Sequence, residues 1–564
     1  MPDLSVPASA AMPAPPATGP RPWPSSVPVL IAGGGPVGLA LSALLARQGI
    51  DSLVVEADDG YCAGSRAICM SRRSLEILGW VDADQATVVK GLPWVGGRSY
   101  YRDTEVLHFQ MPSEPGERFA PMVNIQQYYL EAFAHQAALA CGPHADVRFR
   151  ARVAAVRHDA DGVSVDIETA QGSRQVRAQW LVACDGGRST VREQLGLRME
   201  GTQYEGRYVI VDIVQKTRRE VERLAWFDPP SNPGSTILMH RQPDDVWRID
   251  YQIRDDEDPV EAVKPENVLP RVQSHLDMIG ETEPWEPLWI SIYNAKCLTL
   301  DAYRHGRVLF AGDAAHLVPI FGVRGLNSGL DDAGNLAWKL ASVIAGRADA
   351  SLLDSYSTER VHATRQNIAY GAKSTEFMAP PNFAFSLMRE ATLRLALDQP
   401  AVRSLINPRQ SAPIAYTGAG AALNGPSDFG DDCPGAAPGM PAPEARLDGA
   451  HLSASFGQRF TLLWFGDRAA LPAELAELSA FAQTHAANVQ LRVVVPADSV
   501  PKDGALADID GHAFTRYAAQ AGTLYVIRPD GYVLARWRAP QAAQVRAALA
   551  PFLQTRADGA RHAS

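Results

Sequence analysis

The chain has 564 residues, too many for a single hydrophobic core, so several domains are predicted. Hydrophobic residues make up 46% and charged residues 21%, as in folded soluble proteins, and a formal net charge of -10 disfavours nucleic acid or an anionic membrane as a general partner. No apolar run is long enough to cross a bilayer, and the 6 cysteines show neither C-x-x-C nor metal-ligand spacing. We therefore expect a cytoplasmic protein with reduced thiols and no metal.

Residues 1–26 are rich in proline, alanine and serine and lack the basic and apolar regions of a signal peptide, so a disordered leader is expected. A strongly patterned stretch follows between 27 and 56. An apolar strand at 29–32 leads into Gly-Gly-Gly-Pro-Val-Gly, then come an alanine-rich helix, a second strand at 53–55 and Glu56. This order of elements is typical of a βαβ dinucleotide site.

Each glycine of the G-x-G-x-x-G loop has a physical reason to be present. Gly33 permits a tight turn, Gly35 lets the backbone approach a pyrophosphate, and Gly38 allows close packing of helix on strand. The helix start presents its dipole to the phosphates, and Glu56 can accept hydrogen bonds from a ribose. The alternative is a glycine turn that only packs a βα unit, and the pattern does not choose between FAD and NAD. The predicted loop residues are Gly33, Gly34, Gly35, Pro36, Val37 and Gly38.

The next segments predict a mixture of helices and strands. The expected elements are a helix over 71–80, irregular structure over 92–123, a long helix opening at 125–131, β segments at 147–156 and 163–168, and a strand at 180–183. That last strand runs into Asp185 and Gly186. Strict alternation begins further along, where Trp247 and Tyr251 share one face of a strand while Arg248 and Asp250 share the other. Residues 201–299 are therefore predicted to form an antiparallel sheet.

The remainder of the chain predicts a return to buried strands and helices. A strand at 307–311 ends in Gly312-Asp313, a helix covers about 327–345, and helical segments continue to about 405. Residues 407–445, rich in proline, glycine and alanine, are interpreted as a linker. The strands expected beyond the linker, in a separate small α/β unit, are 460–465, 491–495, 523–527 and 532–537.

Three motifs at strand ends, the glycine loop, DGGRSTVR at 185–192 and GDAAH at 312–316, resemble those of the group A flavoprotein monooxygenases, the single-component FAD-dependent aromatic hydroxylases. The resemblance covers about 27–370, and the C-terminal unit resembles the thioredoxin-like domain of the phenol and polyketide hydroxylase branches, without its C-x-x-C. The resemblance implies an α/β fold with a Rossmann-like FAD-binding domain, an antiparallel β-sheet substrate domain and a thioredoxin-like domain. The implied divisions are a FAD-binding domain at 27–200 and 300–375, a substrate domain at 201–299, a helical and linker segment at 376–445, and a thioredoxin-like domain at 446–564.

The resemblance also implies cofactor contacts. Arg66 matches an arginine near the FAD pyrophosphate, Gln127 a glutamine near the flavin ring, and Asp185 a carboxylate of the second motif. Their alternatives are a surface salt bridge, a helix cap and a turn residue that caps the following helix. Asp313 can accept hydrogen bonds from the ribityl chain. The start of the following helix, Gly325, Leu326 and Asn327, can stabilise negative charge on the reduced ring.

The sequence departs from the family where many relatives have a double proline and Gly-Gln-Gly. Here Pro319 is followed by Ile-Phe-Gly-Val-Arg-Gly. One hypothesis is that Arg324 places a positive charge near the flavin. The alternative is an arginine paired with Asp331 or Asp332, and these two acids are themselves interpreted as helix-start residues on a solvated face.

The activity that the resemblance implies is hydroxylation of a phenolic ring. NAD(P)H reduces FAD, O2 adds to give a C4a-hydroperoxide, and the phenol must be favoured as phenolate by a base or strong acceptor. The candidate residues in the substrate sheet are His240, Tyr204, Tyr208 and Tyr251, with Arg241 for a carboxylate, and the candidate apolar lining is Trp226, Phe227, Trp247 and Phe321. Each has the alternative of an ordinary core residue.

The partners implied are a small aromatic substrate and O2, with a homodimer as an open possibility. A single-ring phenol or phenolic acid is favoured over a polycyclic polyketide, and the choice between NADH and NADPH stays open. A FAD oxidoreductase that does not hydroxylate is a further alternative.

Overall fold

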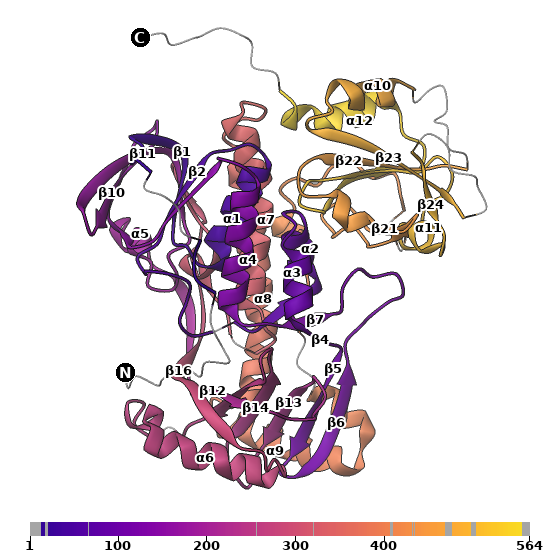
Figure 1. Cartoon of the computed structure of the whole chain (residues 1–564). Coiled ribbons are helices and arrows are strands. Elements are labelled where there is room, and N and C mark those ends of the chain that lie inside the picture. The colour runs from indigo at the N-terminus through magenta and orange to yellow at the C-terminus, as the bar shows by residue number, and fades with distance from the viewer. Residues whose placement is uncertain are drawn as a thin grey trace.

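The computed structural model describes residues 13–16, 21–65, 67–254, 256–319, 321–406, 410–430, 433, 435–467, 476–497 and 504–554. Figure 1 shows three parts, namely a sheet with helices at the upper left, a second sheet beneath it, and a smaller α/β unit at the upper right. Within the described ranges, no helix combines the length and the apolar character that a membrane span requires.

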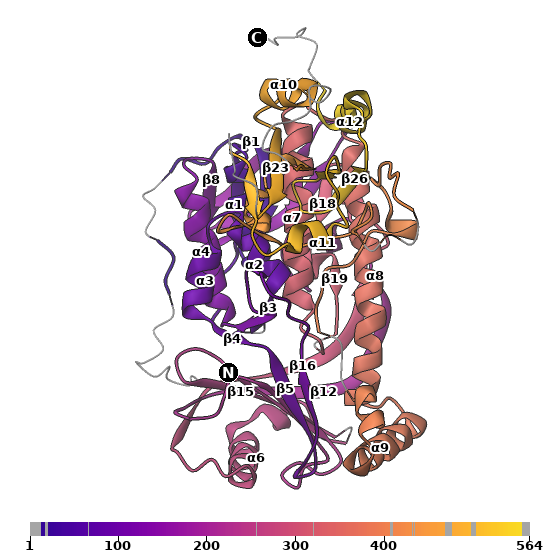
Figure 2. The same ribbon diagram turned by 90° about the vertical axis from the view of Figure 1, so that its right-hand side faces the viewer.

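The helices connect and cover these sheets. Their bounds are α1 Pro36–Arg47, α2 Arg72–Gly79, α3 Asp84–Lys90, α4 Gln127–Ala140, α5 Thr190–Gln194, α6 Pro265–Met278, α7 Gly325–Ile344, α8 Leu352–Met378, α9 Phe383–Asp398, α10 Ala476–Thr484, α11 His512–Arg516 and α12 Ala542–Leu549. The helix α8 runs the height of the molecule, from the C-terminal unit down to the second sheet, where α9 follows it (Figure 2).

The first sheet carries the glycine loop. Its strands are β1 Ser26–Ala32, β2 Ser52–Val55, β8 Ala145–Arg148, β9 Ala151–His158, β10 Val163–Thr169, β11 Gly172–Ala183, β17 Arg304–His305 and β18 Val308–Phe310. Its main path is β17-β18-β11-β1-β2-β8, and β18, β11, β1, β2 and β8 are mutually parallel. Because the carboxyl ends of parallel strands meet at one edge, the three predicted motifs come together there.

The second sheet is larger than predicted. Its strands are β5 Gly96–Tyr101, β6 Thr104–Gln110, β12 Glu200–Gln215, β13 Arg223–Phe227, β14 Thr236–Arg241, β15 Val246–Gln252, β16 Trp285–Thr299 and β19 His316–Leu317, in the order β19-β16-β12-β15-β14-β13-β5-β6. The expectation of irregular structure over 92–123 is wrong, because β5 and β6 form a hairpin that extends this sheet. Tyr100 stacks on Trp226 with ring centroids 5.1 Å apart, and the β5–β13 pair is parallel.

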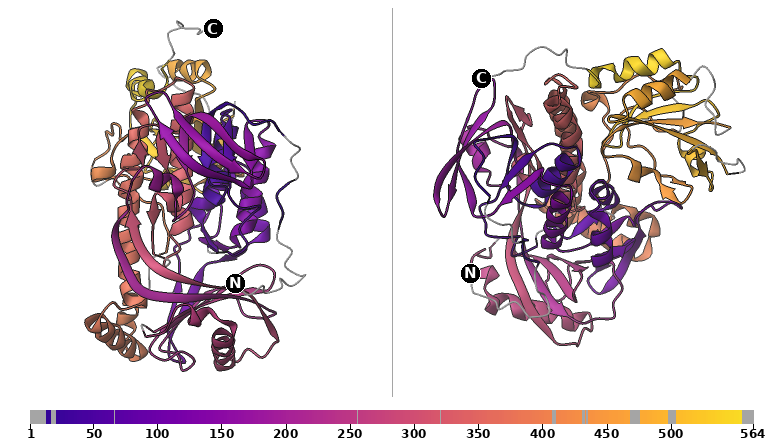
Figure 3. Two further views of the ribbon diagram at one scale, coloured as in Figure 1. Left: turned by 90° about the vertical axis from the view of Figure 1, so that its left-hand side faces the viewer. Right: turned by 45° about the horizontal axis from the view of Figure 1, so that its top comes forward.

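The long strands β12 and β16 curve from the second sheet toward the first, as the left view of Figure 3 shows. Below the second sheet lies α6 (Figure 1). A short third sheet, β3 Cys69–Ser71, β7 Met122–Asn124 and β4 Leu92–Trp94, lies between the two large ones. The second sheet is thereby covered on both faces.

The C-terminal unit contains a five-stranded sheet, in the order β24-β23-β22-β25-β26. Its strands are β22 Phe460–Phe465, β23 Val489–Pro496, β24 Leu506–Asp508, β25 Leu524–Ile527 and β26 Val533–Trp537, beside a small ribbon of β20 Arg446–Leu447 and β21 Ala450–His451. One continuous apolar core includes residues of the first sheet and of this unit, among them Val29 and Ile527. The described linker residues lie on this unit, where Tyr416 stacks on Tyr532 at 4.3 Å.

Most of the expected leader lies outside the described residues. Of the part described, Pro22 and Trp23 belong to the fold, because Arg148 donates a hydrogen bond to the Pro22 carbonyl at 2.8 Å and stacks on the Trp23 ring at 4.2 Å.

Candidate functional site

The glycine loop joins β1 to α1 in a conformation that only glycine permits at two positions. Gly33 has φ +104, and a Cβ there would lie 2.3 Å from the Cys184 carbonyl oxygen. A Cβ on Gly38 would lie 2.1 Å from the Gly33 oxygen. A Cβ on Gly35 would instead enter open space, with no atom within 4 Å. The helix α1 begins beside that space, at Pro36, so its first N–H groups face a volume suited to a pyrophosphate.

Glu56 ends β2 next to this loop. Its carboxylate accepts hydrogen bonds from the Gly34 N–H at 2.6 Å and from the Asp58 N–H at 2.9 Å. These contacts fix the carboxylate at the edge of the loop, and its remaining lone pairs can accept hydrogen bonds from ribose hydroxyls.

Asp185 follows β11 at the same edge of the sheet. Its Oδ2 accepts a hydrogen bond from the Val191 N–H at 3.0 Å, which is the expected cap of α5, while Oδ1 is buried and has no partner among the described residues. Burial raises the pKa of Asp185. A buried carboxylate oxygen without a donor fits a ligand hydroxyl, and the open space at Gly35 fits phosphates. These residues therefore fit a bound dinucleotide.

The third motif lies in a short 3-10 turn, Gly312–Ala314, in which Asp313 is exposed. The Asn327 side chain in α7 is fully engaged within the protein. Its Oδ1 accepts hydrogen bonds from the Ser71 N–H and from Ser74, and its Nδ2 donates to the carbonyls of Cys69 and Val323. Only the backbone of Asn327, with that of Gly325 and Leu326, can thus contribute to charge stabilisation at this helix start.

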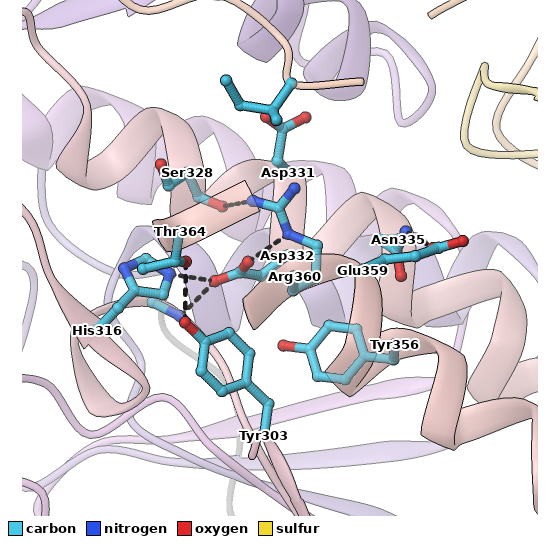
Figure 4. A network of polar contacts seen from close by, with 12 residues as sticks. Tyr303, His316, Ser328, Asp331, Asp332, Asn335, Tyr356, Glu359, Arg360 and Thr364 are labelled. Carbon is cyan, nitrogen blue, oxygen red and sulfur yellow. Dashed lines mark hydrogen bonds and ion pairs between the residues drawn. The ribbon is translucent and has the colours of Figure 1, made fainter. Parts of the chain in front are cut away.

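The interpretation of Asp332 as a helix-start acid on a solvated face is wrong. Its carboxylate is fully buried and accepts hydrogen bonds from the Gly312 N–H at 2.9 Å, His316 Nε2 at 2.7 Å and Arg360 Nε at 2.7 Å. Figure 4 shows this group between α7 and α8, with Tyr303 beneath it. A carboxylate with three donors can remain ionised when buried, and here it fixes the third motif against α7.

The same network continues to the C-terminal unit. Arg528 donates two hydrogen bonds to Glu359 of α8, at 2.6 and 2.9 Å, and Lys339 of α7 contacts Glu359 at 2.7 Å. Asn335 donates to Asp530 at 3.1 Å. Burial acts to raise the pKa of Glu359, but the charges of Arg528 and Lys339 outweigh it and hold that pKa at about 2.

Three remaining cofactor-site predictions have different outcomes. Arg66 lies outside the described residues. Gln127 is the first residue of α4, where its side chain accepts a hydrogen bond from the Ala67 N–H at 3.4 Å and donates to Glu131 at 2.9 Å. Arg324 does not pair with Asp331 or Asp332. Its Nη1 instead donates to Asn367 at 2.9 Å, and its guanidinium lies 5.7 Å from the Tyr370 ring centroid.

The face of the second sheet that points toward the first carries a buried polar group. The register places Arg223, His240, Arg248 and Asp212 in one row across β13, β14, β15 and β12, with Asp250 one pleat further along. Arg248 and Asp212 form an ion pair at 2.8 Å, and Arg248 also donates to the Ser65 carbonyl. Burial lowers the pKa of His240 to about 3, with the charges of Arg223 and Arg248 contributing, so its imidazole is neutral.

Apolar side chains occupy the adjoining part of this face. Tyr208, Phe227, Leu238 and Phe321 belong to one buried cluster, in which Tyr208 and Phe321 lie 5.3 Å apart edge to face. The Tyr208 hydroxyl donates to the Met378 carbonyl at 3.3 Å. The face thus combines a row of polar side chains with a cluster of apolar ones, which suits an aromatic ring that carries polar substituents.

Other predicted substrate-site residues lie elsewhere. Tyr251, Trp226 and Trp247 are in the core on the opposite face, against α6, away from the row of Arg223, His240 and Arg248. Arg241 shares that opposite face and donates to the Arg219 carbonyl at 2.8 Å. Tyr204 lies within β12, but its side chain is outside the described residues. Alternation in the sequence fixes which residues share a face, but not which face meets the cofactor domain.

The residues that sequence reasoning missed are Arg223, Asp250 and Asp212. Alternation placed Arg248 and Asp250 together, which was a usable signal, but that pattern is equally typical of a solvated face. Within the described ranges, no group of histidine, cysteine and acidic side chains is arranged to hold a metal ion.

Comparisons with known proteins agree with this geometry. The family described as "FAD binding domain" matches residues 26–370. A 3-(3-hydroxy-phenyl)propionate/3-hydroxycinnamic acid hydroxylase from Mycolicibacterium smegmatis is 27% identical over 553 residues, covering 95% of each chain. A 6-methylpretetramide 4-monooxygenase from Streptomyces rimosus is 29% identical over 531 residues, covering 90% of each.

Solved structures share the fold. The flavin-dependent monooxygenase PieE, in complex with FAD and substrate, has a TM-score of 0.76 at 21% identity, covering 93% of this chain and 98% of its own. Aklavinone-11 hydroxylase with FAD and aklavinone has a TM-score of 0.74 at 24% identity, covering 93% and 99%.

Proposed function

The chain belongs to the FAD-binding domain family, and from this premise we propose that it is a FAD-dependent monooxygenase that hydroxylates a phenolic ring, with NAD(P)H and O2 as co-substrates. One observation carries the proposal, namely that a buried sheet face with a polar row and an apolar cluster lies near the start of α7. The relatives matched along nearly the whole chain are hydroxylases and monooxygenases by name.

The residues that hold FAD are those of the three motifs. The loop 33–38 and the start of α1 bind the pyrophosphate, Glu56 the ribose, and Asp185 and Asp313 hydroxyl groups of the cofactor. When bound, FAD supplies the two-electron chemistry with NAD(P)H and the activation of O2 that ring hydroxylation requires. The first N–H groups of α7 would stabilise negative charge on the reduced flavin ring.

The second sheet orients the aromatic ring and excludes water. The proposed contact for the ring face is the apolar cluster of Tyr208, Leu238 and Phe321, whose side chains are all buried. His240 is the group proposed to accept the hydrogen bond of the phenol hydroxyl, since its Nδ1 is buried and has no partner among the described residues.

A second candidate function is hydroxylation of a polycyclic polyketide. It is favoured by the similarity to the Streptomyces rimosus enzyme and by the fold shared with aklavinone-11 hydroxylase. The charged side chains of the polar row, such as Arg223 and Arg248, favour the smaller phenols and phenolic acids. A fused-ring ligand has more apolar surface, which these charged groups would not match.

Anaerobic reduction by NADH and by NADPH, with and without a panel of phenols and phenolic acids, tests the proposal. Faster reduction in the presence of one aromatic compound, followed by its hydroxylation in air, supports it and identifies the preferred nicotinamide. Reduction that is fast and indifferent to every aromatic compound identifies a FAD oxidoreductase that does not hydroxylate.

Arg324, the N-cap residue of α7, is proposed to supply a buried positive charge near the reduced ring. Arg324→Gln is expected to slow anaerobic reduction about 10-fold without changing FAD affinity. The positive charge of Arg324 would add to the helix dipole in stabilising the negative charge that develops on the reduced flavin ring. An unchanged reduction rate and unchanged substrate affinity contradict this role.

The C-terminal unit is proposed to be a thioredoxin-like domain from about 446, following a substrate domain that comprises β5, β6 and 200–299. The order of elements along the chain supports this, namely β22, α10, β23, α11, β25, β26 and α12, with β22 parallel to β23 and antiparallel to β25.

We also propose a homodimer through the exposed apolar side chains of α9, namely Phe383, Leu387, Met388 and Leu395. Light scattering on the whole chain and on Leu387→Glu tests it, and a monomeric parent chain contradicts it.

A further inference from the structure

Arg223, His240 and Asp250 lie buried on the face of the second sheet that points toward the first, and each has a polar atom without a partner among the described residues. Arg223 is 3% exposed, His240 5% and Asp250 8%. Within the described part of the chain, Arg223 Nη2, His240 Nδ1 and Asp250 Oδ1 have no hydrogen-bond partner, and none of the three residues forms an ion pair. They come from neighbouring strands and point from the same face. Such groups are rarely left unpaired in a folded protein, so together they indicate a ligand.

The neighbouring ion pair between Arg248 and Asp212 does not supply a partner for Arg223. Arg248 lies one strand from His240, and its guanidinium donates two hydrogen bonds to Asp212 at 2.8 Å each. Asp212 is therefore already neutralised by Arg248 and is not available to Arg223. Burial raises the pKa of Asp250 to about 7, so its carboxyl is largely protonated in weakly acidic solution. Arg223 thus retains a positive charge that the nearby protein groups do not neutralise.

The position of Arg223 relative to the apolar cluster of Tyr208, Leu238 and Phe321 defines what the ligand must contain. Ala225 follows Arg223 by one pleat on β13 and belongs to the apolar cluster with Tyr208, Leu238 and Phe321. Cys69 of β3, which lies near Arg223, is linked through its carbonyl to Asn327 at the start of α7. A ring that packs against this cluster would therefore lie between the start of α7 and the sheet, with one end directed at Arg223.

We propose that Arg223 binds a carboxylate carried by the aromatic substrate, which makes the substrate a phenolic acid. This inference rests on the proposed function and assigns the substrate class to the same site. A guanidinium presents parallel donors that match a carboxylate, and a buried pair of this kind is stronger than one in water. Asp250, in its protonated form, can donate a further hydrogen bond to the same group.

Binding of matched ligands to the FAD-loaded protein tests the proposal. The probes are 3-(3-hydroxyphenyl)propanoate and its carboxamide, measured by isothermal titration calorimetry with the parent chain, Arg223→Gln and Arg223→Lys. The parent chain is expected to bind the acid about 30-fold more tightly than the amide, and Arg223→Gln is expected to lose that preference. Arg223→Lys retains part of it, because the charge remains while the paired donors do not.

Arg241→Gln is the matched control. Arg241 lies one residue from His240 but on the face that meets α6, so its replacement should leave the preference for the acid unchanged. Equal binding of acid and amide by the parent chain overturns the proposal even if Arg223→Gln fails to fold. An Arg223→Gln variant that folds and keeps the preference overturns it as well.

Product analysis separates this inference from the proposed function. If phenols are hydroxylated with no preference for acids, the function stands and the role of Arg223 is wrong. If the acid binds through Arg223 but no ring is hydroxylated in air with NAD(P)H, the anion site stands and the proposed reaction is wrong.

Discussion

Asp250 and His240 show how burial alone changes the chemistry of ordinary side chains. Both lie on the face of the second sheet that points toward the first sheet, and the pKa of each moves in the direction that disfavours charge. The sequence could place Asp250 beside Arg248 by alternation, but the covering of that face depends on residues far away in the chain. The sequence therefore predicted which of these side chains share a face, but not the burial that shifts their pKa values.

The pKa of Asp250 predicts a pH dependence of stability. Burial raises this pKa from 3.8 to about 7, against the opposing charges of Arg248 and Arg223 and with Asp212 acting in the same direction as burial. Between these two values the unfolded chain loses the Asp250 proton while the folded chain keeps it, so stability falls as pH rises through this window. Asp250→Asn removes that loss, which is about 4 kcal/mol at most.

Thermal unfolding of the FAD-loaded parent chain and of Asp250→Asn between pH 4.5 and 7.5 checks this. The Tm difference in favour of the variant should grow with pH. The neighbouring groups that titrate or carry charge here are Arg223, His240, Arg248, Asp212 and Cys69. Asp256→Asn, at an exposed position, is the control and should show no such trend. A constant Tm difference contradicts the raised pKa.

His240 is predicted to matter for ring hydroxylation but not for flavin reduction. His240→Leu should lower the hydroxylation rate about 100-fold, since a positioned proton acceptor contributes at least this much. Anaerobic reduction by NAD(P)H should change little. His108→Gln, at an exposed position on β6, is the control. A variant that hydroxylates at the parent rate rules out the role of His240.

At the scale of elements, the βαβ unit around the glycine loop is the part of the fold that the sequence predicted most fully. The strand, turn and helix lie within three residues of their expected positions, because each follows from local pattern and from glycine geometry. The hairpin of β5 and β6 was missed, although its Val106 and Phe109 are buried on one side. Its pairing with β13 is a contact over more than 120 positions, which local pattern does not report.

Two substitutions in the loop separate folding from cofactor binding. Gly35→Ala adds a Cβ in open space at φ -73, so the apoprotein should fold with an unchanged Tm. The same methyl group enters the volume assigned to the pyrophosphate, and FAD affinity should fall at least 10-fold. Fluorescence titration of the apoprotein with FAD measures this effect.

Gly38→Ala is the comparison for that variant. Its Cβ would lie 2.1 Å from the Gly33 oxygen, so both the stability of the apoprotein and FAD affinity should be lost. If Gly35→Ala binds FAD as tightly as the parent chain, the pyrophosphate does not lie at this turn.

At the scale of the whole molecule, the C-terminal unit is joined to the rest by charges as well as by apolar contact. Arg73 of α2 donates to the Asp530 carbonyl at 2.5 Å, and Arg528 binds Glu359 of α8. The sequence predicted the unit and most of its strands, but it interpreted 407–445 as a linker between independent parts. Buried ion pairs between distant segments leave no local pattern, so this attachment could not be foreseen.

Arg528→Met is predicted to destabilise the protein by about 4 kcal/mol, because Glu359 and Asp530 stay buried while the cation that joins them is removed and only Lys339 remains beside Glu359. Urea unfolding followed by tryptophan fluorescence measures the loss. Arg546→Met breaks an exposed pair with Glu477 and should change stability by less than about 1 kcal/mol. Equal effects of the two substitutions would mean that the Arg528 contacts are no stronger than surface pairs.

The hydrogen bonds that lead from Asp332 through Arg360 to Tyr416, which lies on the C-terminal unit, determine where a chimera of two such proteins can be joined. Arg360 of α8 donates hydrogen bonds to Asp332 of α7 and to the Tyr416 hydroxyl. Buried polar contacts therefore join α7, α8 and the segment that precedes the C-terminal unit. A chimera that exchanges only the residues after the linker would separate Arg528 and Asp530 from their buried partners Glu359 and Asn335. A chimera that keeps these contacts must exchange α7 and α8 together with all the residues that follow them. The crossover point should therefore lie near Gly325 rather than in the proline-rich segment.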